Sequence, residues 1–335
     1  MEQERLTTDS RLSIPKSSFS EEPDHHLPPR SPLTLELATP LERDLRQRYE
    51  ITHENFQDNG SDHCDFHEYS RPGGDQGLVI IFNQEFFDID LPKRAGTSKD
   101  EANLRETFLK LGFNVKMQTI HRDFGRRQIQ DVCKMYAENY ETEHSNSLIV
   151  IFMSHGDKNN VLYTRDGHIE VMDVIQPLSV PFKNKPKMFI FQACKGTVDD
   201  IKTNMIQHET NELIFPIYNL PSDTIIYYST VEGNVSIRDF IDGTWLISEL
   251  CKNFLMYGRR EDIISLLQRT TKCVSIYQTY LKDEKIHYKQ MPVIVSTLQK
   301  KFYLSSNKYR ENMHISNNNI KEAANSLTKL VQQFK

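Results

Sequence analysis

The 335-residue chain predicts an α/β domain with a mostly parallel, six-stranded sheet covered by helices on both faces. Three observations carry this prediction: continuous apolar runs such as LVIIF (78–82) and LIVIFM (148–153), amphipathic segments between such runs, and turn residues at the boundaries. Parallel strands are buried on both faces and therefore lack an alternating pattern. Apolar strands that alternate with helices are typical of such a sheet.

The expected elements follow one another in a regular order from about residue 69. In SKDEANLRETFLKLG the spacing is helical, with Ser98 as cap, Glu101 at the third helical position and Gly112 as stop. The segment 161–171 predicts a hairpin that turns at Asp166-Gly167. The expected strands are 77–82, 114–120, 147–155, 185–194, 224–230 and 290–298, and the expected helices are 98–112, 126–140, 171–179, 245–258 and 261–274.

Two terminal segments differ from this central part in composition. Residues 1–68 are rich in Ser, Pro, Asp, Glu and His, so they are predicted to be disordered because they bury too little apolar surface to offset chain entropy. Residues 306–335 are predicted to form a C-terminal extension, in which NNNIKEAANSLTKLVQQF has the spacing of an amphipathic helix. The folded part is therefore expected within 69–305.

Composition excludes several classes of protein. The formal net charge of −5 argues against nucleic acid or an anionic membrane as the main partner. The start of the chain has no apolar signal segment, and the apolar runs are far shorter than a membrane span. The five cysteines are odd in number and widely spaced, which is typical of a reducing compartment. A soluble, cytoplasmic protein is the expectation.

Two apolar runs end in residues that can carry chemistry. His155 follows LIVIFMS, and Cys194 follows FIFQA, so both would lie at the carboxyl ends of strands, where parallel sheets bind ligands. A thiolate attacks an amide carbonyl, and an imidazole can take a proton and give it to the leaving amine. The backbone amides of Gly156 and Cys194 could stabilise the oxyanion that forms. The pair predicts nucleophilic catalysis on an acyl group.

The sequence around Cys194 resembles the Q-A-C-[RQG]-G signature of the caspases, with Lys195 at the variable position. His155 precedes Cys194 by 39 residues, which is closer than the spacing of about 50 in that signature. The segments similar to caspases occur in the family's order and are KRAGTSKDEANLRETFLKLGF, IFMSHGD, KPKMFIFQACKGT, YYSTVEGNVSIRD and DGTWLISELC. The chain thus resembles an invertebrate-type caspase with a short prodomain.

This resemblance implies a caspase-like three-layer sandwich and a zymogen. The catalytic domain would span 69–305, with a large subunit at 69–200, a linker at 201–221 and a small subunit at 222–305. The resemblance makes Cys194 the nucleophile, His155 the catalytic imidazole, Gly156 a donor to the oxyanion, and Pro92 the residue whose carbonyl orients the histidine. It implies no cofactor, and the histidines and cysteine near residues 63–67 form no tetrahedral metal set.

The resemblance also implies a pocket for aspartate at the P1 position of a substrate. Arg94, Gln192 and Arg238 match the residues that form this pocket in the family. Arginine suits the task because its planar fork binds a carboxylate through two hydrogen bonds. We expect that removal of either arginine costs about 2–5 kcal/mol in transition-state binding.

The segment that would bind P4 departs from the family pattern. Caspases that prefer acidic P4 residues commonly have tryptophan and then Arg-Asn here, whereas this chain has Ser236, Ile237, Arg238 and Asp239. A carboxylate at 239 would repel an acidic side chain, so the prediction is an aliphatic or neutral P4 residue. The likeness places Trp245 beside the same pocket. Lys195, in place of arginine, raises the question of how well the active-site loop is packed.

The expected activation sites are aspartates. Asp199 and Asp200 lie in the segment between the two subunits, and cleavage after Asp200 is the prediction. Asp58 and Asp62 are the expected sites for removal of the prodomain. The leader resembles executioner types, whereas the Arg-Asp pair resembles an initiator, so that question stays open.

Two functions are compatible with these features. The first is a protease that cuts proteins after Asp in apoptosis or a related cascade, as a homodimer of cleaved protomers, with upstream caspases and inhibitor proteins as further partners. The exposed edge strand expected at 290–298 fits such a dimer. The alternative is a catalytically weak relative that acts as a scaffold or regulator of another caspase.

Overall fold

The computed structural model describes residues 67–70, 77–196, 220–239, 243–281 and 286–305. The predicted disordered leader, nearly all of the linker and the C-terminal extension lie outside the described residues, as do Asp58, Asp62, Asp199 and Asp200.

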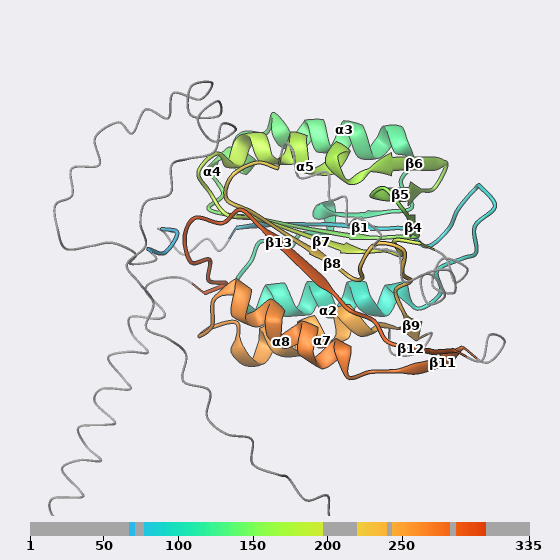
Figure 1. The fold of residues 1–335 in the computed structure, drawn as a ribbon. Helices are drawn as coiled ribbons and strands as arrows, with labels where there is room; N and C mark the ends of the chain where they lie inside the picture. The colour runs from blue at the N-terminus through green and yellow to red at the C-terminus, as the bar shows by residue number, and fades with distance from the viewer. Residues whose placement is uncertain (1–66, 71–76, 197–219, 240–242, 282–285, 306–335) are drawn as a thin grey trace, which may run out of the picture. The chain divides into compact units, whose positions relative to one another are not determined.

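A six-stranded sheet forms the centre of the described domain (Figure 1). The strand order is β13-β8-β7-β3-β1-β2, in which β13 alone runs antiparallel to its neighbour. The strands β1, β3, β7 and β8 are buried along their whole length, which explains their continuous apolar sequences. The bounds are β1 Leu78–Asn83, β2 Ile120–Arg122, β3 Leu148–Met153, β7 Lys187–Gln192, β8 Thr224–Tyr228 and β13 Val293–Ser296.

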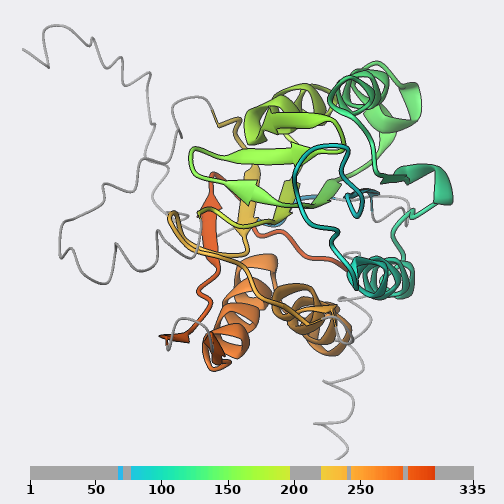
Figure 2. The ribbon, with the colours of Figure 1, turned by 90° about the vertical axis from the view of Figure 1, so that its right-hand side faces the viewer.

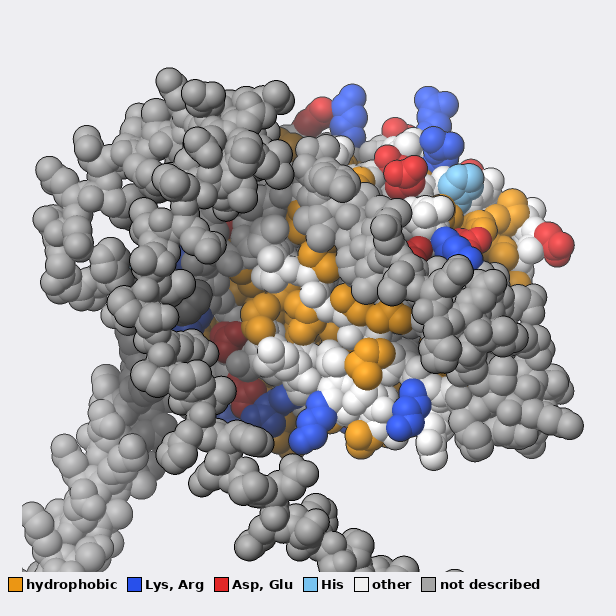
Figure 3. All heavy atoms as spheres, in the orientation of Figure 1, with side chains coloured by type: hydrophobic (Ala, Val, Ile, Leu, Met, Phe, Trp, Pro, Cys, Tyr) orange, Lys and Arg blue, Asp and Glu red, His pale blue; other side chains and the backbone are white. Residues whose placement is uncertain are grey.

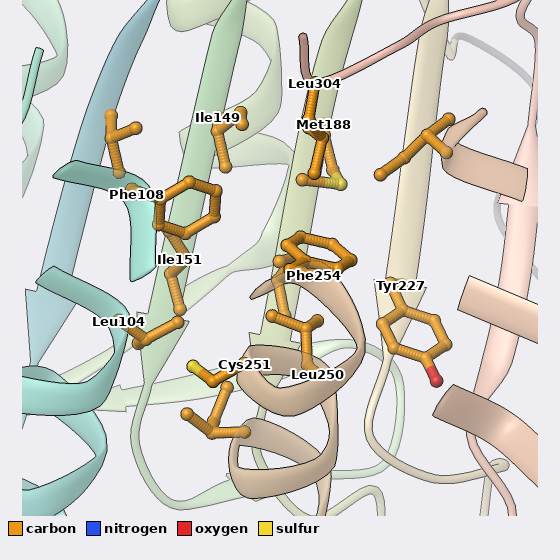
Figure 4. Packing of buried hydrophobic residues seen from close by; sticks show 14 of the residues in the cluster. Leu104, Phe108, Ile149, Ile151, Met188, Tyr227, Leu250, Cys251, Phe254 and Leu304 are labelled. Atoms are coloured by element: carbon orange, nitrogen blue, oxygen red, sulfur yellow. The ribbon is translucent and has the colours of Figure 1, made fainter. Parts of the chain in front are cut away.

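Helices cover both faces of this sheet (Figures 1 and 2). One face packs against α3 and α5, with α4 near one end, and the other against α2, α7 and α8. Figure 4 shows the hydrophobic core between the sheet and the helices α2, α7 and α8, where Phe108, Ile151 and Phe254 pack together. The predicted α/β sandwich is confirmed. The helices are α2 Thr97–Lys110, α3 Arg126–Ala137, α4 Tyr140–His144, α5 Val171–Ser179, α7 Trp245–Tyr257 and α8 Ile263–Ser275.

Short strands lie outside the main sheet and shape its carboxyl edge. The segments β4, β5 and β6 form one small sheet, β9 pairs with β10, and β11 pairs with β12. Two 3-10 turns complete the described elements. The bounds are β4 Gly156–Asp157, β5 Val161–Thr164, β6 Gly167–Glu170, β9 Arg238–Asp239, β10 Gly243–Thr244, β11 Thr279–Leu281, β12 Ile286–Tyr288, η1 Met117–Thr119 and η2 Val180–Phe182.

The start of α2 differs from the sequence prediction. The helix begins at Thr97, and its N-cap is Gly96, with a left-handed φ of 87° and no side-chain cap, so the prediction of Ser98 as cap was wrong. Glu101 does not return to the cap backbone, because its carboxylate accepts hydrogen bonds from Asn83 and Arg122. Tertiary partners thus replace the expected capping box.

Two further boundaries were also predicted incorrectly. The expected strand 114–120 is interrupted by a 3-10 turn at Met117–Thr119, where Thr119 bonds back to the carbonyl of Lys116. Asn114 makes an isolated bridge to Leu78 of β1, and the paired strand β2 begins only at Ile120. The expected helix 126–140 ends at Ala137, and α4 follows as a separate short helix. Both differences occur at the edge of the domain, where few neighbours extend the regular structure.

Candidate active site

The carboxyl ends of β3 and β7 form one cleft. These strands are adjacent, with Met153 paired to Gln192, so His155 and Cys194 each follow the strand end by two residues. A cavity of about 350 Å³ lies over this edge. Its lining includes seven of the residues singled out in the sequence and consists of Arg94, Ser154, His155, Gln192, Ala193, Cys194, Ser236, Ile237, Arg238 and Thr244.

The His155 ring is held by a backbone carbonyl. Its Nε2 donates to the oxygen of Pro92 at 2.8 Å, as the resemblance implied, and this leaves Nδ1 as the acceptor in the neutral ring. The ring of Phe87 packs against it, with centroids 5.0 Å apart. Burial lowers the pKa of His155, an effect that the Pro92 hydrogen bond opposes and that Arg94 and Arg238 reinforce. The ring is therefore neutral near pH 7.

The Cys194 thiol lines the same cleft as His155. Its Sγ accepts the backbone N–H of Ser236 at 3.4 Å. Burial raises the pKa of Cys194, although the Ser236 amide and the two arginines act in the opposite direction. The resting pair is thus a neutral thiol and a neutral imidazole. The thiol must lose its proton as it reacts.

Gly156 packs directly against the backbone of Cys194. A Cβ at this position would lie 2.4 Å from the carbonyl oxygen of Cys194 and 2.9 Å from the Cβ of Ala193. Only glycine fits such an approach. The backbone N–H groups of Gly156 and Cys194 therefore belong to neighbouring segments of one loop cluster, as an oxyanion site requires.

Arg94 is one of the largest fully buried side chains in the described domain. Its Nη1 donates to the carbonyl of Gln84 at 2.7 Å and to Thr97 Oγ1 at 3.2 Å. Thr97 in turn donates to Asn83, whose amide donates to Glu101. Burial, followed by the like charge of Arg238, lowers the pKa of Arg94 to about 9. The side chain remains cationic at neutral pH.

The opposite wall comes from the segment after the linker. Gln192 Nε2 donates to Ser236 Oγ at 2.5 Å, and the Ile237 N–H donates to Gln290 Oε1 at 2.8 Å. Gln192 Oε1 and Arg238 Nε are buried and have no hydrogen-bond partner among the described residues. Burial lowers the pKa of Arg238. The cleft therefore has unused polar groups from both Gln192 and Arg238.

Lys195 is well packed, which answers the question raised by the sequence. Its ammonium is buried and bonds to Asn160 Oδ1 and Glu232 Oε2, each at 2.8 Å. The same group lies 4.2 Å from the centre of the Tyr228 ring. Glu232 Oε1 also accepts the N–H of Asn159 at 2.7 Å. This cluster joins the loop after β4, the residue after Cys194 and the segment after β8.

Trp245, which was predicted to bind substrate, lies apart from this cleft. Trp245 begins α7, makes an edge contact with Tyr277 and lines a separate cavity of about 470 Å³. Asp239 lies in β9, where its backbone pairs with Gly243. The two cavities share only Thr244 among their lining residues. The expected contact of Trp245 with P4 therefore stays a prediction.

Sequence reasoning missed the residues that support the arginines and the imidazole. Asp100 and Glu101 resemble ordinary acids in the first turn of a helix, and Thr97, Asn83 and Phe87 carry no motif.

Among the described residues, no group of three or more His, Cys, Asp or Glu could hold a metal ion. No helix in this part of the chain combines the length and apolarity needed to span a membrane.

Comparison with known proteins identifies the family. Residues 76–303 match the caspase domain. The chain is 33% identical over 254 residues to caspase-6 of Mus musculus, covering 68% of this chain and 88% of that protein, and 30% identical over 237 residues to its caspase-3, covering 68% and 84%. The crystal structure of caspase-1 from Spodoptera frugiperda matches with a TM-score of 0.61 and 26% identity, covering 73% of this chain and 96% of that one. The chain therefore belongs to the caspase family and is a cysteine-type endopeptidase.

Proposed function

We propose that the protein cleaves protein substrates after aspartate, with Cys194 as nucleophile and His155 as general acid and base. The observation that carries the proposal is that one cleft is lined by the thiol, the oriented imidazole and two arginines. The caspase family implies the same specificity. Because Cys194, His155, Arg94 and Arg238 are all present, the scaffold alternative gains no support.

The reaction follows from the positions of these groups. As Cys194 Sγ attacks the carbonyl carbon, its proton passes to Nδ1 of His155, while the Pro92 carbonyl holds the other ring nitrogen. The carbonyl oxygen becomes an oxyanion, which the N–H groups of Gly156 and Cys194 stabilise. The imidazolium then protonates the leaving amine, and a thioester remains. Water, deprotonated by His155, hydrolyses this thioester and regenerates the thiol.

Specificity for aspartate rests on charge. Arg94 and Arg238 carry two positive charges into a largely buried cleft, and the Gln192 amide contributes further hydrogen-bonding capacity. A carboxylate supplies both negative charge and paired acceptors, which match arginine donors. Asparagine at P1 offers neither the charge nor two acceptors. For P4 we retain the preference for aliphatic or neutral residues.

Activation, assembly and cellular role complete the proposal. We propose a zymogen that is cut after Asp200, loses its leader at Asp58 or Asp62, and acts in an apoptotic or related cascade in the cytoplasm. The described cysteines are free thiols, which supports a reducing compartment. Upstream caspases and inhibitor proteins are the further partners that we propose.

A homodimer is supported by the edge of the sheet. β13 pairs with β8 on one side, and no described strand pairs with its other side. Its valines and isoleucine are partly buried, and Figure 3 shows apolar side chains gathered on the face where Figure 1 places this strand. An apolar edge of this kind favours pairing with a second copy. Sedimentation of the cleaved protein as a monomer would contradict this part of the proposal.

Turnover by the full-length chain, with its linker cleaved, tests the central claim. Peptides that differ only in Asp, Glu or Asn at P1 serve as substrates, with Cys194→Ala as the inactive variant. Cys273→Ala is the matched control, because Cys273 is a partly exposed free thiol that does not line the cleft. We expect cleavage after Asp that is lost in the first variant and kept in the second. No turnover by the cleaved wild type would favour the scaffold instead.

A further inference from the structure

A buried carboxylate lies behind the cleft and has no role in the mechanism above. Asp100, in the first turn of α2, has an exposed fraction of 0%. Its Oδ1 accepts the backbone N–H of Thr244 at 2.9 Å, whereas Oδ2 is buried without a hydrogen-bond partner among the described residues. A buried carboxylate with a free oxygen costs free energy, so its surroundings must compensate for it.

The hydrogen bond of Asp100 leads to Arg238. Thr244 lies in β10, and its register partner across the two-residue ladder is Arg238 in β9. Thr244 also lines the cleft and caps α7, since its hydroxyl accepts the N–H of Ile247 at 3.4 Å. Because the ladder is so short, few hydrogen bonds fix it. The anchor from α2 therefore restricts where Arg238 can lie.

The backbone next to Thr244 is shaped to the carboxylate. Gly243 has a left-handed φ of 85°, and a Cβ there would lie 2.3 Å from Asp100 Oδ1. Glycine is required by both the conformation and the space. Asp100 and β10 thus fit closely together, which gives the anchor a defined geometry.

The charge of Asp100 acts on the same two arginines. It raises the pKa of both Arg94 and Arg238, while Arg238 lowers that of Arg94. Burial raises the pKa of Asp100 to about 6, so at neutral pH it is mostly ionised. The buried Asp100 carboxylate therefore offsets two arginine charges, one buried and one partly exposed, that repel each other in the absence of substrate.

We propose that Asp100 is the positioning residue of the aspartate pocket: through Thr244 it holds the strand that carries Arg238, and its charge offsets the repulsion between the two arginines. This inference rests on the proposed function, because it concerns the pocket for P1. Asp100 acts through Thr244 and Arg238 and needs no contact with substrate. Its loss should therefore impair recognition of the P1 carboxylate more than the chemical step.

Three variants of the full-length, linker-cleaved enzyme test this role. Asp100→Ala removes both the hydrogen bond to Thr244 and the negative charge. Asp100→Asn keeps an acceptor for the Thr244 N–H but is neutral. Gly243→Ala keeps the negative charge, but its added Cβ pushes the carboxylate away from β10. Asp223→Asn is the matched control: Asp223 is also buried and accepts hydrogen bonds from Tyr69 and Ser222, but it does not line the cleft. The measurements are kcat and KM for a P1-Asp peptide, together with thermal unfolding.

We expect KM to rise at least tenfold in Asp100→Ala, with kcat changed less than threefold, and KM to rise in the same direction in Gly243→Ala. Asp100→Asn should recover part of the loss, because it restores the acceptor for the Thr244 N–H but not the charge, and Asp223→Asn should leave both constants within twofold. An unchanged KM in Asp100→Ala would overturn the proposal, as would a kcat effect alone or Asn behaving like Ala. If Asp100→Ala does not fold, the KM and kcat of Asp100→Asn and Gly243→Ala test the proposal by the same criteria. Failure of the wild type to cleave after Asp would instead refute the proposed function.

Discussion

Arg94 and Arg238 each place a guanidinium group in the same cleft, but the two side chains differ in burial and in hydrogen-bond partners. Arg94, before the linker, is fully buried and donates to Gln84 and Thr97. Arg238, after the linker, is partly exposed, lies on a two-residue strand and has an unpaired Nε. One arginine is thus built into the core of the domain, whereas the other depends on short local pairing.

This difference shows how a pocket can be half preformed. The side formed by Arg94 and His155 follows from the central strands and α2, which fold as one core. The side formed by Ser236, Ile237 and Arg238 adds few buried contacts of its own, and such segments lie at the low end of local stability. Changes on the second side should therefore affect substrate binding without affecting the fold.

Replacing each arginine by alanine gives the largest expected effect on this comparison. Arg94→Ala and Arg238→Ala should each lower kcat/KM by a factor of about 30 to 4,000, because either change removes one of the two cationic partners of the substrate carboxylate. Only Arg94→Ala should also lower the free energy of unfolding, by about 1–3 kcal/mol, since it removes buried hydrogen bonds. Steady-state kinetics and denaturant unfolding measure the two effects. Equal stabilities of the two variants would remove the distinction between them.

Glu232→Gln tests the cluster that joins the two sides. Its carboxylate binds Lys195 and the N–H of Asn159, so its loss leaves a buried ammonium with weaker partners. We expect kcat/KM to fall about tenfold, which corresponds to about 1.4 kcal/mol.

Glu261→Gln is the control for that change, because Glu261 forms an ion pair with Arg269 on the distant helix α8. Its kinetics should match the wild type. If the two glutamine variants behaved alike, Glu232 would have no special part in aligning the cleft.

Thr97→Val addresses the preformed side alone. The substitution keeps the side chain's volume but removes the hydroxyl between Arg94 and Asn83. We expect KM for a P1-Asp peptide to rise about threefold, because Arg94 keeps its stronger bond to Gln84. Thr270→Val, which breaks a buried hydroxyl bond within α8, should not change KM. A loss in the control as large as in the test variant would contradict the assignment.

Phe87→Leu should have the smallest effect, visible in the pH dependence of kcat/KM. Burial lowers the pKa of His155, and the Phe87 ring, which packs against the imidazole, contributes to that burial. With less cover the pKa rises toward its ordinary value of about 6.5. The acid limb, where His155 becomes protonated and inactive, should then move to higher pH.

Phe86→Leu is the matched control, because Phe86 is the adjacent residue and contacts Lys93 in place of His155. Its pH profile should coincide with that of the wild type. A shift to lower pH in Phe87→Leu would show that the ring does not act through burial of the imidazole.

The sequence by itself determined the fold class and pointed to the proposed reacting pair. Continuous apolar runs require burial on both faces, and this requirement leads to a parallel sheet between helices. Residues just after the strands of such a sheet lie at one edge, so the sequence placed His155 and Cys194 at the same edge, and the pairing of β3 with β7 made their strands neighbours. The signature around Cys194 then pointed to the family, and the comparisons confirmed it.

Only the tertiary structure decided how the cleft is supported. Ser98 had the sequence context of a cap, yet Gly96 is the N-cap, and the Glu101 carboxylate accepts hydrogen bonds from Asn83 and Arg122. The contact between Asp100 and Thr244 joins residues 144 positions apart, and no local pattern records it. Local sequence encodes periodicity and turns, whereas hydrogen bonds between distant segments depend on how the layers pack. The support of the two arginines therefore became visible only in the folded chain.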